Sequence, residues 1–114
     1  MPATEKLLEE HPDADVIMCL NDLAAMGSMA ALKEQGRDGQ ILVYGVDGSP
    51  DGKGMIAEGI MTATSAQFPR KIGRMAADVI YRFFEGENVP RRVLVQTELV
   101  TKENLEEYGA DGWQ

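Results

Sequence analysis

Apolar runs of strand length alternate with helical patterns along this chain of 114 residues, and this alternation constrains its fold most strongly. Strands are predicted for residues 15–20 (DVIMCL), 40–44 (QILVY), 60–66 (IMTATSA) and 93–100 (VLVQTELV). Helices are predicted for residues 4–10, 23–35, 51–58, 70–84 and 101–107. Because strands that alternate with helices form parallel or mostly parallel sheets, we predict an α/β fold with about four strands and flanking helices.

The charge of the chain excludes several kinds of partner. Its formal net charge of −8 opposes binding to nucleic acid or to anionic lipid, since both attract cationic surfaces. Only residues 68–95 depart from this pattern, with 3 acidic and 6 basic residues. No apolar run approaches the roughly 20 residues of a membrane span. The first residues lack the basic and apolar regions of a signal peptide, so we expect none in this chain.

Few residues are available for catalysis or metal binding. The single cysteine, Cys19, excludes an internal disulfide and a multi-cysteine zinc site, and His11 is the single histidine. No nucleophile with a partner base is apparent, so we expect neither an enzyme nor a cofactor. Residues 45–54 are rich in glycine but lack the spacing of a phosphate loop. Residues 47–58 match part of a calcium loop, but a strand precedes them and Pro50 interrupts them, which disfavours a metal site.

One planar polar side chain follows each of the first three predicted strands. These residues are Asn21, Asp47 and Gln67. The carboxyl ends of parallel strands meet at one edge of the sheet, where ligands of open α/β sheets bind. Carboxylates and amides suit vicinal hydroxyl groups, because they accept, or both donate and accept, hydrogen bonds. We therefore predict a site for a polyhydroxylated ligand, although the same spacing equally suits Asn21 and Asp47 as residues that only cap turns.

Several short motifs, in order along the chain, resemble sugar-binding proteins of the periplasmic-binding-protein-like, type I, ribose-binding kind. They are residues 11–13 (HPD), 16–17 (VI), 21–27 (NDLAAMG), 31–34 (ALKE), 43–48 (VYGVDG), 62–67 (TATSAQ), 72–73 (IG) and 99–104 (LVTKEN). The resemblance covers nearly all of residues 5–108. It implies a fold of two α/β lobes that clamp a monosaccharide and deliver it to the membrane permease of an ABC importer. The sugar-contacting positions of that family match Asn21, Asp47 and Gln67.

The resemblance is confined to the C-terminal end of that family, so the chain is expected to be a fragment that forms a partial lobe. Within this single partial domain, residues 1–67 would form the lobe core and residues 68–92 a helix that covers the other lobe. Residues 93–114 would form a returning strand and a C-terminal helix. The full-length parent would act outside the cytoplasm, in the periplasm or anchored to the membrane.

A regulatory alternative also fits the resemblance. The effector-binding domain of LacI-type, sugar-responsive repressors shares the fold and the Asn21–Asp22 element, but its turn after the second strand usually carries two consecutive acids. Here that turn reads Asp47-Gly48, which favours transport. With half of the sugar site absent, we expect weak sugar binding. We also expect a homodimer through helix 70–84 or strand 16–20, because both would have lost their usual neighbours.

Overall fold

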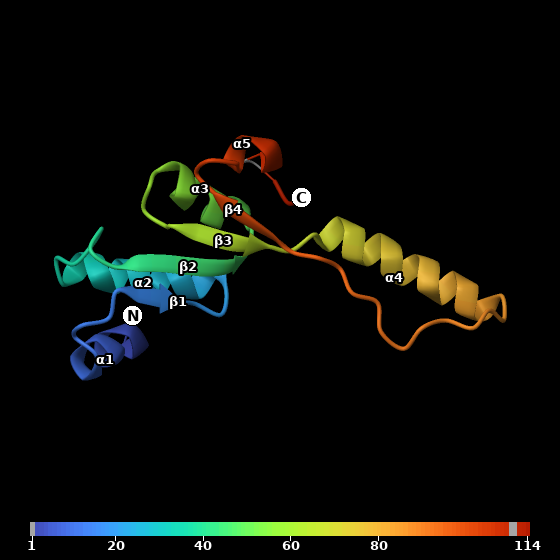
Figure 1. The fold of residues 1–114 in the computed structure, drawn as a ribbon, viewed down its shortest axis with the longest axis horizontal. Coiled ribbons are helices and arrows are strands. Elements are labelled where there is room, and N and C mark those ends of the chain that lie inside the picture. Colours follow the sequence, from blue (N-terminus) through green and yellow to red (C-terminus); the bar gives the residue numbers. More distant parts are fainter. Residues whose placement is uncertain (1, 110–111) are drawn as a thin grey trace.

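A sheet of four strands is the centre of the computed structural model, which describes residues 2–109 and 112–114. Its strands are β1 (Val16–Met18), β2 (Leu42–Asp47), β3 (Ala63–Ala66) and β4 (Glu98–Thr101), and they lie in the order β1-β2-β3-β4 (Figure 1). The strands β1, β2 and β3 are parallel, whereas β4 runs antiparallel to β3. The predicted α/β fold with a mostly parallel sheet of four strands is confirmed.

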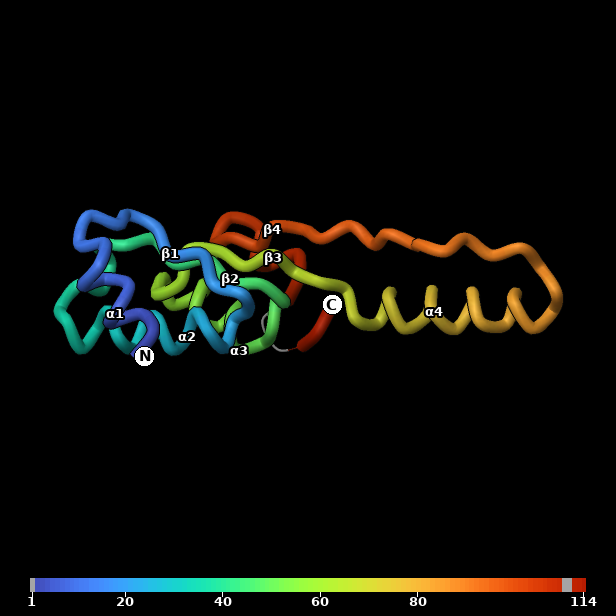
Figure 2. The backbone as a smooth tube through the Cα atoms, turned by 90° about the horizontal axis from the view of Figure 1, so that it is seen from below, coloured from blue at the N-terminus to red at the C-terminus, as the bar shows by residue number. Residues whose placement is uncertain are grey.

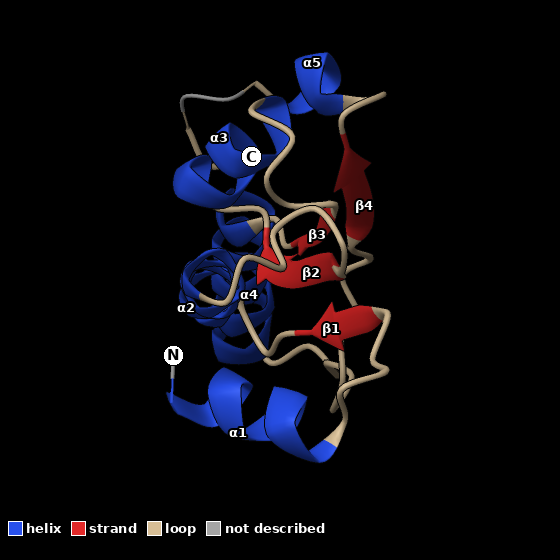
Figure 3. Cartoon of the chain, turned by 90° about the vertical axis from the view of Figure 1, so that its left-hand side faces the viewer, coloured by secondary structure: helices blue, strands red, loops and turns tan. Residues whose placement is uncertain are grey.

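Helices cover one face of this sheet. Along the chain, the helices of the described residues are α1 (Pro2–Glu10), α2 (Asp22–Glu34), α3 (Pro50–Ala57), α4 (Pro69–Phe84) and α5 (Leu105–Tyr108). Figure 3 shows α2 and α3 on the same side of the strands, and α1 packs beside α2. The hydrophobic core lies in this layer and consists of Leu8, Ala25, Leu32, Ile41, Val43, Ile56, Met61, Ala66 and Val100.

The opposite face of the sheet is open. Paired residues of neighbouring strands point to the same face, and the register pairs Val16 with Leu42 on this face. Val16 is 45% exposed, Leu42 48% and Met18 73%. The strand predicted at residues 15–20 is therefore covered on one face only, the face on which α2 and α3 lie.

Three predicted strands are shorter than expected. The first, β1, occupies only Val16–Met18 of the predicted 15–20. The amide of Ile60 donates to the carbonyl of Met55 at 2.9 Å, so residues 59–61 close the C-terminus of α3 and β3 begins only at Ala63. Gly59 provides the positive φ of 73° that this helix end requires. The strand predicted at 93–100 begins only at Glu98 and ends at Thr101, because the chain before it runs beside α4 and away from β3.

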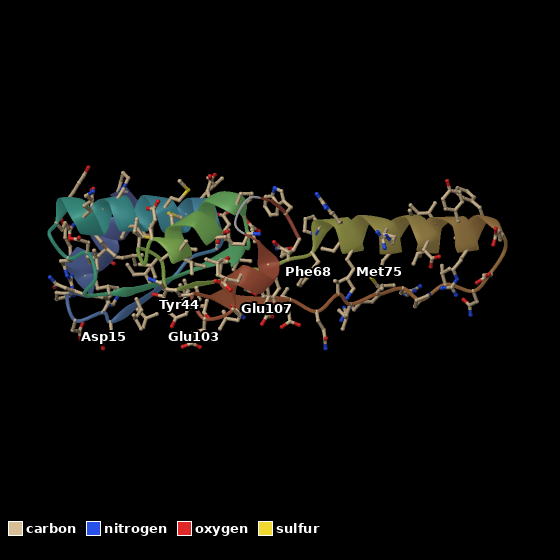
Figure 4. All side chains as sticks on the ribbon, turned by 90° about the horizontal axis from the view of Figure 1, so that it is seen from above. Asp15, Tyr44, Phe68, Met75, Glu103 and Glu107 are labelled. Atoms are coloured by element: carbon tan, nitrogen blue, oxygen red, sulfur yellow. The ribbon has the colours of Figure 1, made fainter. Side chains whose placement is uncertain are left out.

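Helix α4 projects from the rest of the molecule. It has no buried residue, and the segment 85–97 returns alongside it (Figure 2). Figure 4 shows Met75 between the helix and this returning segment. The radius of gyration is 17.7 Å, well above the roughly 13 Å of a compact chain of this length. Among the described residues, no helix combines the length and the apolar character that crossing a membrane requires.

An ion pair closes the far end of α4. The Nε atom of Arg82 lies 2.7 Å from Oε2 of Glu87, just beyond the helix, and Asp78 lies one turn before. The hydrogen bond and the charge of Glu87 raise the pKa of the Arg82 guanidinium, and Asp78 adds to this effect. The pair is exposed, so it contributes little to stability.

Candidate ligand-binding site

The three candidate residues lie at the same edge of the sheet. Asp47 is the last residue of β2, Gln67 directly follows β3, and Asn21 lies three residues after β1. These strands are adjacent and parallel, so their carboxyl ends face the same way. The edge lies at the end of the core from which α4 projects (Figure 1).

Asp47 and Gln67 form a hydrogen-bonded pair. The side-chain Nε2 of Gln67 donates to Oδ1 of Asp47 at 2.8 Å, and the Gln67 amide donates to the Asp47 carbonyl at 3.0 Å. Both residues are half-buried. An ionised carboxylate offers about four lone-pair positions and the amide retains its carbonyl oxygen, so the pair keeps capacity for further hydrogen bonds. The pair can therefore accept hydrogen bonds from the hydroxyl groups of a ligand, and its acceptor atoms are already oriented.

Asn21 caps a helix. Its Oδ1 accepts a hydrogen bond from the amide of Ala24 at 2.8 Å, and this makes it the N-cap of α2. The following residue, Asp22, is the first residue of the helix. Asn21 is half-buried, and its side-chain amide group can still donate. The side-chain oxygen of Asn21 is thus engaged in capping α2, whereas the side chains of Asp47 and Gln67 bind each other.

The backbone of Asp47 is strained. Its φ of 123° lies in a region that residues with a side chain rarely adopt. Such residues cost about 1–3 kcal/mol each and persist only where their surroundings hold them. Gly48 follows with φ 70°, and its amide donates to Oγ1 of Thr64 at 3.1 Å. Strain of this kind often accompanies a functional site, and here it coincides with a candidate ligand-binding carboxylate.

Asp22 is a buried polar centre that the sequence did not reveal. Its side chain is 1% exposed. Its Oδ2 accepts hydrogen bonds from the amide and the hydroxyl of Ser49, at 2.8 and 2.7 Å, and its Oδ1 accepts from Oγ1 of Thr64 at 2.6 Å. A Cβ at Gly45 or Gly52 would collide with this carboxylate, so glycine is required at both positions. Asp22 thereby joins the start of α2 to the turn after Asp47 and to β3.

The C-terminal tail reaches the same edge. Lys53 is fully buried in α3, and its Nζ donates to the carbonyl of Gly112 at 2.6 Å and to Oε1 of Gln114 at 3.2 Å. The Nε2 of Gln114 in turn contacts the carbonyls of Asp47 and Gln67. The sequence pattern gave the tail no role, since a buried lysine cannot be told from an exposed one without the fold.

A shallow hollow of about 420 Å³ opens beside Asp47. It is lined by Asp22, Leu23, Met26, Asp47, Ser49, Pro50, Asp51 and Trp113. A separate hollow of about 280 Å³ lies near the start of β2, between Met29, Ile41 and Gly59. Of the three candidate residues, only Asp47 lines the first hollow, whereas the second hollow lies at the opposite edge of the sheet. Within the part of the chain that the structure describes, no three His, Cys, Asp or Glu side chains gather where a metal ion could be held.

Comparison with known proteins identifies the family. The sequence profile described as "Periplasmic binding protein domain" matches residues 2–88, and the chain belongs to this family. It is similar to the ribose import binding protein of Salmonella typhimurium strain LT2, with 35% identity over 99 residues, which is 87% of this chain and 33% of the relative. The D-allose-binding periplasmic protein of Escherichia coli K12 is 43% identical over 67 residues, which cover 59% of this chain and 22% of that relative.

Solved structures agree with this result. A solute binding protein of an ABC transporter from Actinobacillus succinogenes 130z, with bound D-allose, superimposes with a TM-score of 0.86 at 28% identity and covers 94% of this chain and 37% of that structure. A solute binding protein from Bacillus halodurans C-125, with bound myo-inositol, gives 0.84 at 30% identity and covers 94% and 37%. The chain spans about one third of the length of the curated relatives that it matches.

Proposed function

We propose that this chain supplies one wall of a monosaccharide site in the solute-binding component of an ABC-type sugar importer. The hydrogen-bonded pair of Asp47 and Gln67 at the carboxyl ends of β2 and β3 carries this proposal, because it presents oriented acceptors to a polyol. The names of the relatives support it, since they bind ribose, allose or myo-inositol, which are all polyhydroxylated rings. Asn21, at the same edge, would contribute its side-chain amide.

The proposed function is binding without chemistry. The matched relatives are binding proteins rather than enzymes. The polar groups of the site are partly engaged with one another, as between Gln67 and Asp47, which suits recognition of hydroxyl groups. In the full-length parent, this site would face a second lobe, and the complex would deliver sugar to a membrane permease outside the cytoplasm.

The division of the chain supports the same proposal. Residues 1–67 hold most of the buried core, with Val100 of β4 completing it, whereas α4 within residues 68–92 has no buried residue. We propose that α4 is the helix that covers the other lobe in the parent. In this chain its apolar side remains exposed, with Ile80 54% and Phe83 62% accessible. A second copy that covers α4 or the edge strand β1 would make the chain a homodimer.

The affinity of this chain for sugar is expected to be weak. Micromolar binding requires about −8 kcal/mol. Hydrogen bonds to charged groups contribute about 1.5–3 kcal/mol each, before the loss of freedom on binding is subtracted. Two or three residues of one wall, without a second wall, therefore correspond to millimolar dissociation constants.

Titration of the ¹⁵N-labelled chain with D-ribose, followed by NMR, tests the proposal. We expect saturable shifts of the Asp47 and Gln67 amides at millimolar ribose. The variant Asp47→Ala should abolish these shifts, whereas Asp38→Ala, at an exposed site near the opposite edge, should leave them unchanged. Saturable shifts that map to the hollow near Met29 instead would contradict the proposed site, and so would the absence of any shift at high ribose concentration.

A further inference from the structure

The side chain of Gln114 touches the backbone of both paired residues. Its Nε2 lies 3.3 Å from the carbonyl oxygen of Asp47 and also donates to the carbonyl oxygen of Gln67. The NH₂ group of a primary amide carries two hydrogens, so it can donate one hydrogen bond to each of the two carbonyls. The tail that carries Gln114 lies outside the residues 2–88 that the family profile matches. The contact ties the C-terminal residues of the chain to both members of the pair.

Lys53 fixes the orientation of the Gln114 amide. The Nζ of this fully buried lysine donates to Oε1 of Gln114 at 3.2 Å and to the carbonyls of Gly112 at 2.6 Å and Tyr108 at 3.2 Å. An ammonium group can only donate, so it requires the oxygen of the amide on its side. The NH₂ group must then face the two carbonyls at the end of the sheet. The direction of the amide thus follows from the chemistry of its neighbours.

The contact lies where the backbone is strained. Asp47 has a φ of 123°, and a strained residue keeps its conformation only if its neighbours determine it. Gln114 also packs against the next residue of the turn, because a Cβ at Gly48 would lie 2.6 Å from Nε2 of Gln114. The carbonyl of Asp47 already accepts from the amide of Gln67, so Gln114 adds a second donor to the joint between the two strands.

We propose that Gln114 is a positioning residue, which holds Asp47 and Gln67 in their paired arrangement from behind the ligand-binding edge. Lys53, in α3, holds the Gln114 amide in place, and the NH₂ group of Gln114 binds the carbonyls of Asp47 and Gln67. The consequence for sugar affinity rests on the proposed function of the site. The positional role itself does not, because it concerns the unliganded chain.

The variant Gln114→Glu separates the two ends of the amide. It keeps the size and the oxygen that faces Lys53, but it replaces the NH₂ group by an oxygen that faces two carbonyl oxygens. Gln96→Glu is the matched control, because it makes the same change at an exposed position of the segment beside α4. In the ¹⁵N-labelled chain without ligand, Gln114→Glu should shift the side-chain amide signals of Gln67 and accelerate their exchange with solvent. Gln96→Glu should leave both unchanged.

The same variants are then titrated with D-ribose. We expect Gln114→Glu to raise the dissociation constant by roughly three- to tenfold, the effect of a single hydrogen bond. Gln114→Ala removes the donors without adding a charge and should shift the same signals. Unchanged Gln67 signals in both variants would overturn the proposal, even if the melting temperature falls. If the signals respond while the wild-type chain gives no ribose shifts, the positioning role stands and the proposed function fails.

Discussion

At Asp47, a strained backbone and a candidate ligand-binding carboxylate coincide in one residue. Glycine adopts a φ of 123° without the steric penalty, although it loses more conformational freedom on folding. We therefore expect Asp47→Gly to raise the free energy of unfolding by up to about 1 kcal/mol, because the strain removed exceeds the entropy and the Gln67 hydrogen bond that are lost. The same change should abolish the NMR response to D-ribose. Urea unfolding measures the first effect and titration the second.

Asp47→Asn serves as the control for this change. It keeps the strained backbone and an acceptor for Gln67, so its stability should lie near or slightly below that of the wild-type chain. If Asp47→Gly were less stable than Asp47→Asn, the hydrogen bond from Gln67 would outweigh the strain, and the explanation of the unusual φ would be wrong.

The buried carboxylate of Asp22 supports a second prediction at this scale. Its two oxygens accept three hydrogen bonds from Ser49 and Thr64. In Asp22→Asn, one oxygen becomes an NH₂ group, and at least one of these donors loses its acceptor inside the core. We expect a loss of about 1–3 kcal/mol in the free energy of unfolding by urea. Asp51→Asn, at an exposed position in the first turn of α3, should change it by less than about 0.5 kcal/mol.

At the scale of elements, α4 differs from α1, α2 and α3, each of which has buried residues. None of its 16 residues is buried, whereas α2 contributes Ala25 and Leu32 to the core. An isolated helix of about this length is marginally stable in water. In hydrogen exchange measured by mass spectrometry, the amides of α4 should exchange much faster than those of α2 and β2. Protection of α4 equal to that of α2, persisting in a dilute sample, would show that it is covered within one chain.

The sequence predicted the elements better than it predicted their contacts. The pattern of apolar residues revealed α2, α4 and the parallel strands, because helices and strands space their apolar residues differently along the chain. It overestimated the lengths of β1, β3 and β4. For β3 and β4 the reason is that the helix end at Ile60 and the path of segment 85–97 depend on tertiary contacts. It also failed to identify the contact between Lys53 and Gln114, because these two residues are 61 positions apart in the chain. Such pairs become recognisable only when the fold is known.

At the candidate site, too, the sequence predicted the positions of residues but not their contacts. The position of Asn21, Asp47 and Gln67 at one edge is a direct consequence of parallel strands, so residue order alone was sufficient to predict it. The pairing of Asp47 with Gln67 and the capping role of Asn21 depend on side-chain geometry. Whether all three contact a sugar stays a prediction.

At the scale of the whole molecule, two exposed apolar surfaces favour association. One is the stripe along α4 that includes Ile72, Ile80 and Phe83, and the other is the open face of the sheet around Met18. Burial of an apolar side chain stabilises by about 1.5–3 kcal/mol. A few such residues from each of two copies approach or exceed the cost of association, which is estimated at about 4–15 kcal/mol. This balance supports a second copy of the chain as the partner.

Light scattering over a dilution series tests this prediction. We expect a dimer at concentrations of tens of micromolar and dissociation on dilution, because the contact is apolar but limited in area. The double variant Ile80→Lys and Phe83→Lys places two charges on the stripe, and charged groups lose hydration when they are buried. It should be monomeric throughout if α4 forms the contact. The matched pair Ala77→Lys and Tyr81→Lys adds the same charge to the other side of α4 and should remain dimeric. A dimer that survives the first pair would assign the contact to β1 and the open face, whereas a wild-type chain that is monomeric at every concentration would contradict the homodimer itself.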